Sequence, residues 1–309
     1  MHKSCPITLL TLILLSINAN CQKKVLIAKP VSESITIDAK IDEEAWALNH
    51  GVATDFIMYE PDNGKPISQD KKTEVKVLYD NNAIYVSAIL YDNEPNKIQR
   101  EITNRDVFGV SDHFSVAING FNDGQQDFRF YVSASGVQMD CIATEGGEDF
   151  SWDAIWDSSV KITDFGWVVE MKIPYAALRF SGAPKQVWGS KGIISLLHNP
   201  GILKGIEDIK TPTRLFFIPY TSAYYQQDQT TSDRTIKAGL DIKYGINDAF
   251  TLDAILVPDF GQTKFDNAIL NLEPFEQKLD ENRPFFTEGT NLFNIGDLFY
   301  SRRIGGLPS

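Results

Sequence analysis

The sequence predicts an all-β protein whose larger part is an antiparallel β-sandwich. Short segments alternate between apolar and polar residues with a period of two, and Gly, Asp or Asn residues bound each of them. Almost no long helical pattern lies between these segments. Many short strands at even spacing are typical of antiparallel sandwiches.

The first 21 residues have the pattern of a secretory signal peptide. A positively charged start precedes an apolar run over residues 6–17, and the small residues Ala19 and Cys21 favour cleavage before Gln22. The run is too short for a membrane-spanning helix, which needs about 20 residues. We therefore expect an exported protein, with lipidation of Cys21 as the alternative to cleavage after it.

The predicted strands of the sandwich follow in order along the chain. Their segments are rich in β-branched and aromatic residues and end at Asp, Asn or Gly turns. Short helical turns are expected at 42–46 and 174–178. Strands are expected over residues 34–38, 74–79, 83–91, 113–119, 128–133, 158–162 and 167–173.

A change of composition marks the expected end of the sandwich. Residues 181–212 have no clear period and are rich in Gly and Pro. We therefore place the sandwich domain at 22–180, an irregular connector at 181–220 and a second domain at 221–309. In that domain, residues 237–244 and 249–257 alternate around Asn247 and Asp248, which predicts a hairpin.

The charge of the chain excludes one class of partner. The formal net charge is −12, and removal of residues 1–21 takes away one lysine and no acidic residue, which gives −13. An acidic surface repels phosphate backbones, so no nucleic-acid partner is expected. Cys141 is the one cysteine outside the signal peptide, so it has no internal disulfide partner and is expected to be a small buried residue.

The sequence lacks the common motifs of catalysis. It has no GxSxG, HExxH, Walker or CxxC motif, no GxGxxG after a strand, and its four histidines show no metal-ligand spacing. A glycosidase needs only two carboxylates, and 41 acidic residues always supply a nominal pair. No catalytic residue is therefore assigned.

Tryptophan side chains are the strongest candidates for ligand binding. Sugars pack their flat C–H faces on indole rings, and all five tryptophans precede the second domain. Trp46 and Trp167 lie within apolar patterns and are expected in the core. Trp152, Trp156 and Trp188 lie near an acidic loop or in the irregular segment, so they are the candidate carbohydrate-binding residues, with a core role as the alternative.

The acidic loop itself, over residues 140–153, predicts a structural calcium site. Carboxylate oxygens on a glycine-containing loop suit calcium. The candidate ligands are Asp140, Glu145, Glu148, Asp149 and Asp153, with Asp157 close by in the sequence. Because the spacing of an EF-hand is missing, a solvated acidic loop is the alternative.

An ordered set of motifs resembles family 9 carbohydrate-binding-module-like domains over about residues 30–180. The motifs are residues 37–46, 77–80, 84–86, 111–114, 136–140, 152–156 and 166–180. The resemblance implies a jelly-roll-like sandwich, carbohydrate binding, a role in carbohydrate catabolism and association with glycosyl hydrolases. The chain departs from the family after Trp188 and Gly189, where residues 190–200 lack its arginine-rich stretch. Family members also hold a sugar between two tryptophans, neither of which aligns securely here.

The C-terminal residues resemble a second family, a domain of unknown function. The resemblance rests on residues 258–262, 281–289 and 298–305. In that family the domain follows such a sandwich and continues as a long β-barrel in the outer membrane. It therefore implies a partial set of β-barrel hairpin strands over 221–309, contact with the outer membrane through them, and a chain that stops before its barrel is complete.

These observations predict a non-catalytic carbohydrate-binding sandwich that is exported to the outer membrane, the periplasm or the cell surface. Its expected partner is a polysaccharide or an oligosaccharide. Two alternatives stay open. One is a structural plug or cap of an outer-membrane barrel with no sugar ligand, and the other is a hydrolase of O-glycosyl compounds.

Overall fold

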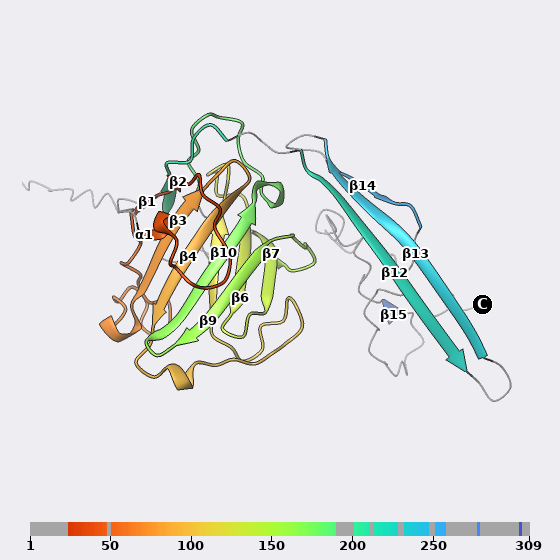
Figure 1. Ribbon diagram of the computed structural model, residues 1–309, viewed down its shortest axis with the longest axis horizontal. Coiled ribbons are helices and arrows are strands. Elements are labelled where there is room, and N and C mark those ends of the chain that lie inside the picture. Colours follow the sequence, from red (N-terminus) through yellow and green to blue (C-terminus); the bar gives the residue numbers. More distant parts are fainter. Residues whose placement is uncertain are drawn as a thin grey trace, which may run out of the picture.

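The structure, a computed structural model, is built mainly of β-strands (Figure 1). It describes residues 24–47, 51–189, 201–209, 213–227, 232–246, 251–257, 277–278 and 303–304. Two β-sheets form a sandwich, and a separate three-stranded sheet follows it, so the predicted fold class is confirmed. The predicted signal peptide, with Cys21, lies outside the described residues. Among the described residues, no helix is long and apolar enough to cross a membrane.

The first sheet of the sandwich is built around two long strands of β-branched and aromatic residues. Asp80 closes the turn between β3 and β4, because its carboxylate accepts hydrogen bonds from the backbone N–H groups of Asn82 and Ala83. β2 joins β3 in parallel, and the other pairs are antiparallel. The strand order is β2 (Lys29–Pro30), β3 (Thr73–Tyr79), β4 (Ala83–Tyr91), β10 (Gly166–Pro174) and β9 (Asp157–Thr163).

The second sheet is antiparallel throughout and packs its apolar side chains against the first. Successive side chains of a strand point to opposite faces, so every second residue enters the core. On β10 these are Trp167, Val169, Met171 and Ile173, and on β6 they are Phe128, Phe130 and Val132. The strands, in spatial order, are β5 (His113–Ile118), β6 (Asp127–Ser133), β7 (Gln138–Thr144) and β8 (Gly147–Asp149).

The outer face of the first sheet is covered by residues 31–47, which include helix α1 (Glu44–Ala47). Trp46 is buried there against the sheet, as predicted for a core residue. The strand predicted at 34–38 does not form in this segment. No strand pairs with it, and side chains bind its backbone instead: Glu170 Oε2 accepts from the N–H groups of Asp38 (3.1 Å) and Ala39 (2.8 Å).

The sandwich extends beyond the predicted boundary at residue 180. Strand β11 (Ile202–Lys204) pairs in parallel with β1 (Val25–Ile27), and Trp188 and Ile206 are each 1% exposed in the core. The predicted connector at 181–220 is therefore wrong for its described residues up to 209. Pairing between the two ends of the domain determines this region, and local composition does not reveal such pairing.

The second domain begins with a long hairpin. Strands β12 (Leu215–Gln227), β13 (Ser232–Gly245) and β14 (Thr251–Ile255) form an antiparallel sheet. The pairing of β13 with β14 confirms the predicted hairpin strands, and Asn247 and Asp248 lie outside the described residues. β15 (Gln277–Lys278) pairs with β16 (Arg303–Ile304). Short 3-10 turns are η1 (Gln69–Lys71), η2 (Pro95–Lys97) and η3 (Tyr175–Ala177), the last at a predicted position. The residues of 258–262 and 281–289 lie outside the described residues.

The three-stranded sheet has two chemically different faces. Directly opposed residues of an antiparallel pair share a face, and the pairs Leu215–Tyr244 and Phe217–Ile242 belong to one of them. We call this the apolar face; it comprises Leu215, Phe217, Pro219, Thr221, Ala223, Tyr225, Ile236, Ala238, Leu240, Ile242, Tyr244, Leu252 and Ala254, and at the hairpin end of β12 and β13 it also carries Gln227, Ser232 and Arg234. Asp241, Lys237, Lys243 and Asp253 lie on the opposite, polar face.

Candidate functional site: a pocket between the sandwich and the C-terminal sheet

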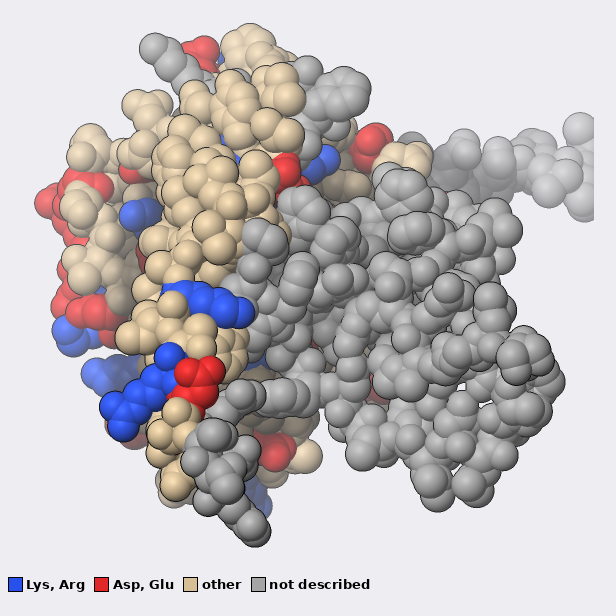
Figure 2. Space-filling view, turned by 90° about the vertical axis from the view of Figure 1, so that its right-hand side faces the viewer, with Lys and Arg blue, Asp and Glu red and all other residues tan. Residues whose placement is uncertain are grey.

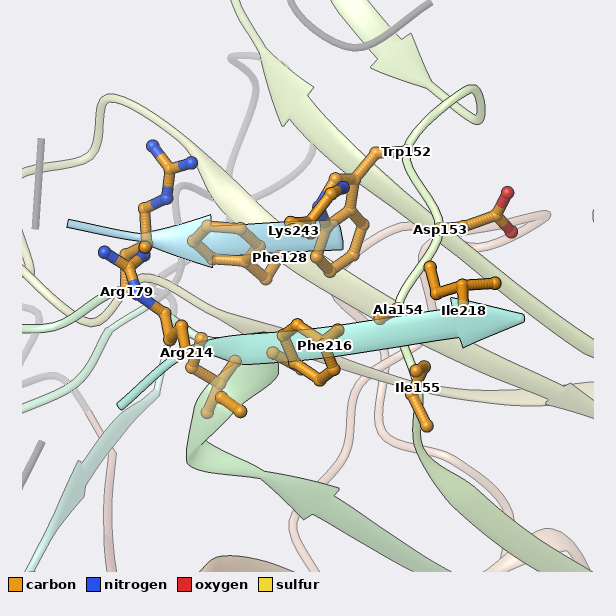
Figure 3. Close-up of a pocket in the computed structure, with 14 residues that line it drawn as sticks. Phe128, Trp152, Asp153, Ala154, Ile155, Arg179, Arg214, Phe216, Ile218 and Lys243 are labelled. Carbon is orange, nitrogen blue, oxygen red and sulfur yellow. The ribbon is translucent and has the colours of Figure 1, made fainter. Parts of the chain in front are cut away.

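A pocket with a volume of about 140 Å³ opens between the sandwich and the sheet β12–β14 (Figure 3). The sandwich contributes Phe128 of β6, the loop 152–155 and the residues 176–179 that follow β10. The sheet contributes side chains of its polar face and the neighbouring Arg214. The polar face of the sheet is therefore turned toward the sandwich, and the apolar face is turned away from it.

Trp152 is the partly exposed indole of this pocket. Its ring packs on Phe128 with a centroid distance of 5.2 Å and an interplanar angle of 58°, and on Phe130 at 6.0 Å and 72°. In Figure 3, Trp152 and Phe128 stand together, with Phe216 of β12 across the pocket from them. The core thus fixes one side of the indole and leaves part of the ring to the pocket.

A buried carboxylate holds the loop that carries Trp152. Asp140 on β7 has no exposed surface. Its Oδ1 accepts the backbone N–H of Ala154 (2.9 Å), and its Oδ2 accepts the indole N–H of Trp156 (2.8 Å). The Arg105 guanidinium donates to Asp140 Oδ2 and to the carbonyl oxygen of Ala154 (3.1 Å). These bonds tie the loop 152–156 to the second sheet and to the loop of residue 105.

The same network determines the ionisation of Asp140. Burial raises the pKa of this carboxyl to about 6, although the Trp156 N–H and the Arg105 guanidinium favour its charged form. At neutral pH Asp140 is therefore charged, and Arg105 supplies its counter-charge. Such a charge pair, with further hydrogen bonds to the remaining oxygen, is the arrangement that a buried carboxylate requires.

The structure separates the three candidate tryptophans. Trp156 is 5% exposed and packs edge-on against Phe130, and Trp188 is 1% exposed and packs among Tyr175 and Phe180. Neither indole presents an open face, so the structure places both in the core role that was the alternative for them. Trp152 alone of the three remains a candidate for stacking on a sugar. Cys141 is buried, as expected.

The predicted calcium ligands do not come together as one set. The expected acidic loop is largely the β7–β8 hairpin, which carries its residues to different faces. Asp140 and Asp153 converge with Asp106, their carboxylate oxygens all within 4.8 Å of one another. Glu148 pairs with Arg129 at 2.5 Å, Asp149 accepts from the N–H of Ser151, and Glu145 is exposed beside the hairpin turn. Arg105 already lies among the three converging carboxylates.

Sequence reasoning missed most of the residues that line the pocket. Arg179, Arg214 and Lys243 come from three separate segments, and nothing in their local sequence marks them as neighbours. Arg105 and Asp106 were missed for the same reason. The available signal was the motif of residues 152–156, whose Trp152 and Asp153 both line the pocket.

The described pocket lacks the pair of carboxylates that a glycosidase needs. Asp153 is the one carboxylate among the described lining residues. Its nearest acidic partners, Asp106 and Asp140, lie in the network around Arg105. The arrangement suits binding, because an aromatic face, a carboxylate and several cationic groups surround one small space.

Two family models match the chain. Residues 37–194 match the carbohydrate family 9 binding domain-like family. This match covers half of the chain, and the protein belongs to that family. Residues 211–309 match a domain of unknown function, DUF5916. The two matches meet close to the structural boundary between the sandwich and β12.

Several solved structures resemble part of the chain, with TM-scores below 0.5. A family 9 carbohydrate-binding module from Caldicellulosiruptor kristjanssonii in complex with cellotriose has 17% identity, with 54% of this chain and 73% of that chain covered and a TM-score of 0.37. Its complex with glucose has 17% identity, 54% and 75% coverage and a TM-score of 0.36. A candidate carbohydrate-binding protein from Bacteroides uniformis has 10% identity, 59% and 89% coverage and a TM-score of 0.41. No curated protein matches the chain.

Proposed function

We propose that this protein binds carbohydrate without catalysis, and that the pocket around Trp152 is its sugar site. Membership of the carbohydrate family 9 binding domain-like family supports the class of ligand. The observation that carries the site is the partly exposed Trp152, whose loop is held by Asp140 beside a pocket of about 140 Å³. A role in carbohydrate catabolism, as the binding part of a degrading system, belongs to the same proposal.

The expected affinity is low. One face of an indole covers about 100 Å² of sugar surface, which at about 25 cal/mol per Å² contributes about 2.5 kcal/mol. A Kd of 1 mM needs about 4.1 kcal/mol and association costs offset part of the indole contribution, so a neutral monosaccharide should bind with a Kd of roughly 10 mM or weaker. Ligand-observed NMR suits this range.

The test is a titration of the chain from residue 22 against a panel of mono- and oligosaccharides, with Trp152→Ala as the variant. Loss of the indole should abolish detectable binding while the circular dichroism spectrum stays native. Phe165→Ala is the matched control, because Phe165 is also partly exposed (43%) but lies in the turn before β10, at the far end of that strand from residues 176–179. Unchanged sugar binding by a folded Trp152→Ala protein would refute the assignment of the site.

We also propose that the protein is exported and that β12–β14 contacts the lipid of an outer membrane. The apolar face supports this proposal: Phe217 is 59% exposed and Ile236 is 81% exposed. On the side of the molecule where this sheet lies, Figure 2 shows an area without Lys, Arg, Asp or Glu side chains in the upper part and a group of such side chains below it. Transmembrane β-strands alternate in this way, with apolar residues toward lipid and polar residues inward. The sandwich next to the polar face also fits the alternative of a cap without a sugar ligand, which the Trp152 titration distinguishes.

A further inference from the structure

The pocket gathers positive charge on an acidic protein. The chain has a formal net charge of −12, yet Arg179, Arg214 and Lys243 all line the pocket, and Asp153 is the one carboxylate among its described lining residues. The charges are also ordered in space. In Figure 3, Arg179 and Arg214 stand at one end of the view, Trp152 and Lys243 near the middle, and Asp153 at the other end.

We propose that the pocket binds a saccharide that carries a carboxylate, of the hexuronic acid class. A guanidinium group binds a planar carboxylate through paired, charge-assisted hydrogen bonds, which suits the end where Arg179 and Arg214 lie. The C–H face of the sugar ring packs on Trp152. Asp153 lies at the opposite end; its Oδ1 accepts a hydrogen bond from Arg105 (3.2 Å), and its other oxygen accepts hydrogen bonds from hydroxyl groups of the sugar. This inference rests on the proposed carbohydrate-binding function and specifies its ligand.

The size of the pocket selects one ring of such a saccharide. Its volume of about 140 Å³ is well below the roughly 300–1,000 Å³ of pockets that hold drug-sized ligands. A single uronic acid residue, at a chain end or as a branch, is therefore the unit that enters.

The experiment compares galacturonate, galactose and acetate as ligands of the chain from residue 22. Galacturonate differs from galactose by its carboxylate, and acetate offers the carboxylate without a ring. We expect galacturonate to bind at least about tenfold more tightly than galactose, since hydrogen bonds to charged groups are the strong ones. Its affinity should fall as salt is raised, because screening weakens exposed charge pairs.

Variants distinguish the contribution of the cationic side chains to binding from the contribution of the Trp152 ring. Arg214→Gln should remove the preference for galacturonate over galactose, and Lys243→Gln gives a second variant should the first fail to fold. Arg234→Gln is the matched control, because Arg234 lies toward the other end of β13, over the ring of Tyr225. It should keep the full preference. Trp152→Ala should weaken the binding of both sugars.

The outcomes distinguish this inference from the function on which it rests. Equal affinity for galacturonate and galactose would overturn the inference and leave the carbohydrate-binding function standing. Acetate binding as tightly as galacturonate would also overturn it, because the pocket would then be an anion site. Failure of both sugars to bind would overturn the proposed function together with the inference.

Discussion

Glu170 on β10 is a carboxyl group enclosed between the sandwich and residues 31–47, with no exposed surface. Only its Oε2 has partners, the two backbone N–H groups of Asp38 and Ala39, and its Oε1 is buried without one. Burial is the largest cause that raises the pKa of Glu170 from an ordinary 4.5 to about 7, and the charges of Glu43 and Asp38 add to it. Ionisation of Glu170 in the folded protein therefore lowers the free energy of unfolding.

This raised pKa predicts a fold that loses stability as the pH rises. Between about pH 4.5 and 7 the folded chain holds a proton on Glu170 that the unfolded chain has released, so the contribution of this group is fully favourable below 4.5 and declines through 7. Glu170→Gln keeps an oxygen for both N–H groups and removes the titration. We expect the variant to lose this part of the pH dependence and to gain up to about 3 kcal/mol of unfolding free energy at about pH 8.

Urea denaturation of both proteins at about pH 5 and pH 8 measures the effect. Glu94→Gln is the control, because the side chain of Glu94 is 54% exposed and its replacement should leave the pH profile unchanged. A Glu170→Gln protein with the profile of the parent would show that Glu170 does not titrate in this range.

Arg105 supports the Trp152 loop and also supplies the charge that a metal would bring. Arg105→Ala leaves the buried Asp140 without its cationic partner, which should lower the free energy of unfolding by about 2–4 kcal/mol. We therefore expect the parent chain to melt at the same temperature in chelator and in calcium, since Arg105 already lies among Asp106, Asp140 and Asp153. In Arg105→Ala, calcium should raise the melting temperature.

Thermal melts of parent and variant, each with chelator and with millimolar calcium, check both expectations. A calcium-dependent rise in the parent chain would restore the predicted structural calcium site, with these three carboxylates as ligands.

At the scale of an element, the turn between β9 and β10 depends on one glycine. Gly166 has a φ of +139°, and a Cβ there would lie 2.0 Å from the carbonyl oxygen of Leu90. Strained backbone and a clash with a neighbouring strand should make Gly166→Ala destabilising by at least about 2 kcal/mol. Gly182→Ala is the matched control, because a Cβ at Gly182 meets nothing within 4 Å. Equal melting temperatures for the two variants would contradict this account of the turn.

The elements also show what the sequence could and could not predict. Most strands of the sandwich could be predicted because the alternation of apolar and polar residues lies within each strand; these are β3, β4, β5, β6, β9 and β10. The helical turns α1 and η3 could be predicted because their turn residues are neighbours in the sequence. β7 was missed because Asp140 and Cys141 interrupt its pattern, although both are buried. The pairing of β1 with β11 could not be predicted, because nearly the whole sandwich sequence separates the two strands. The pocket could not be predicted from the sequence for the same reason. Its residues Arg179, Arg214 and Lys243 come together only when separate elements pack.

At the scale of the whole molecule, the chain combines a sandwich with a buried core and a sheet whose apolar face has no sandwich against it. The core of the sandwich is continuous from β1 to Ile206, whereas Phe217, Ile236 and Leu252 of the apolar face are exposed. Large exposed apolar patches mark surfaces that contact lipid or another protein. The two parts should therefore differ in their affinity for membranes.

We expect the chain from residue 22 to float with vesicles of phosphatidylethanolamine and phosphatidylglycerol in a density gradient, through the apolar face. Ile236→Lys puts a charge on this face, which costs about 2–4 kcal/mol at the middle of a bilayer, so flotation should be strongly reduced. Thr235→Lys is the matched control, because Thr235 is the next residue of β13 and lies on the polar face. It should float like the parent. If both variants float equally well, lipid does not contact the apolar face, and the sheet would instead belong to an interface with another protein.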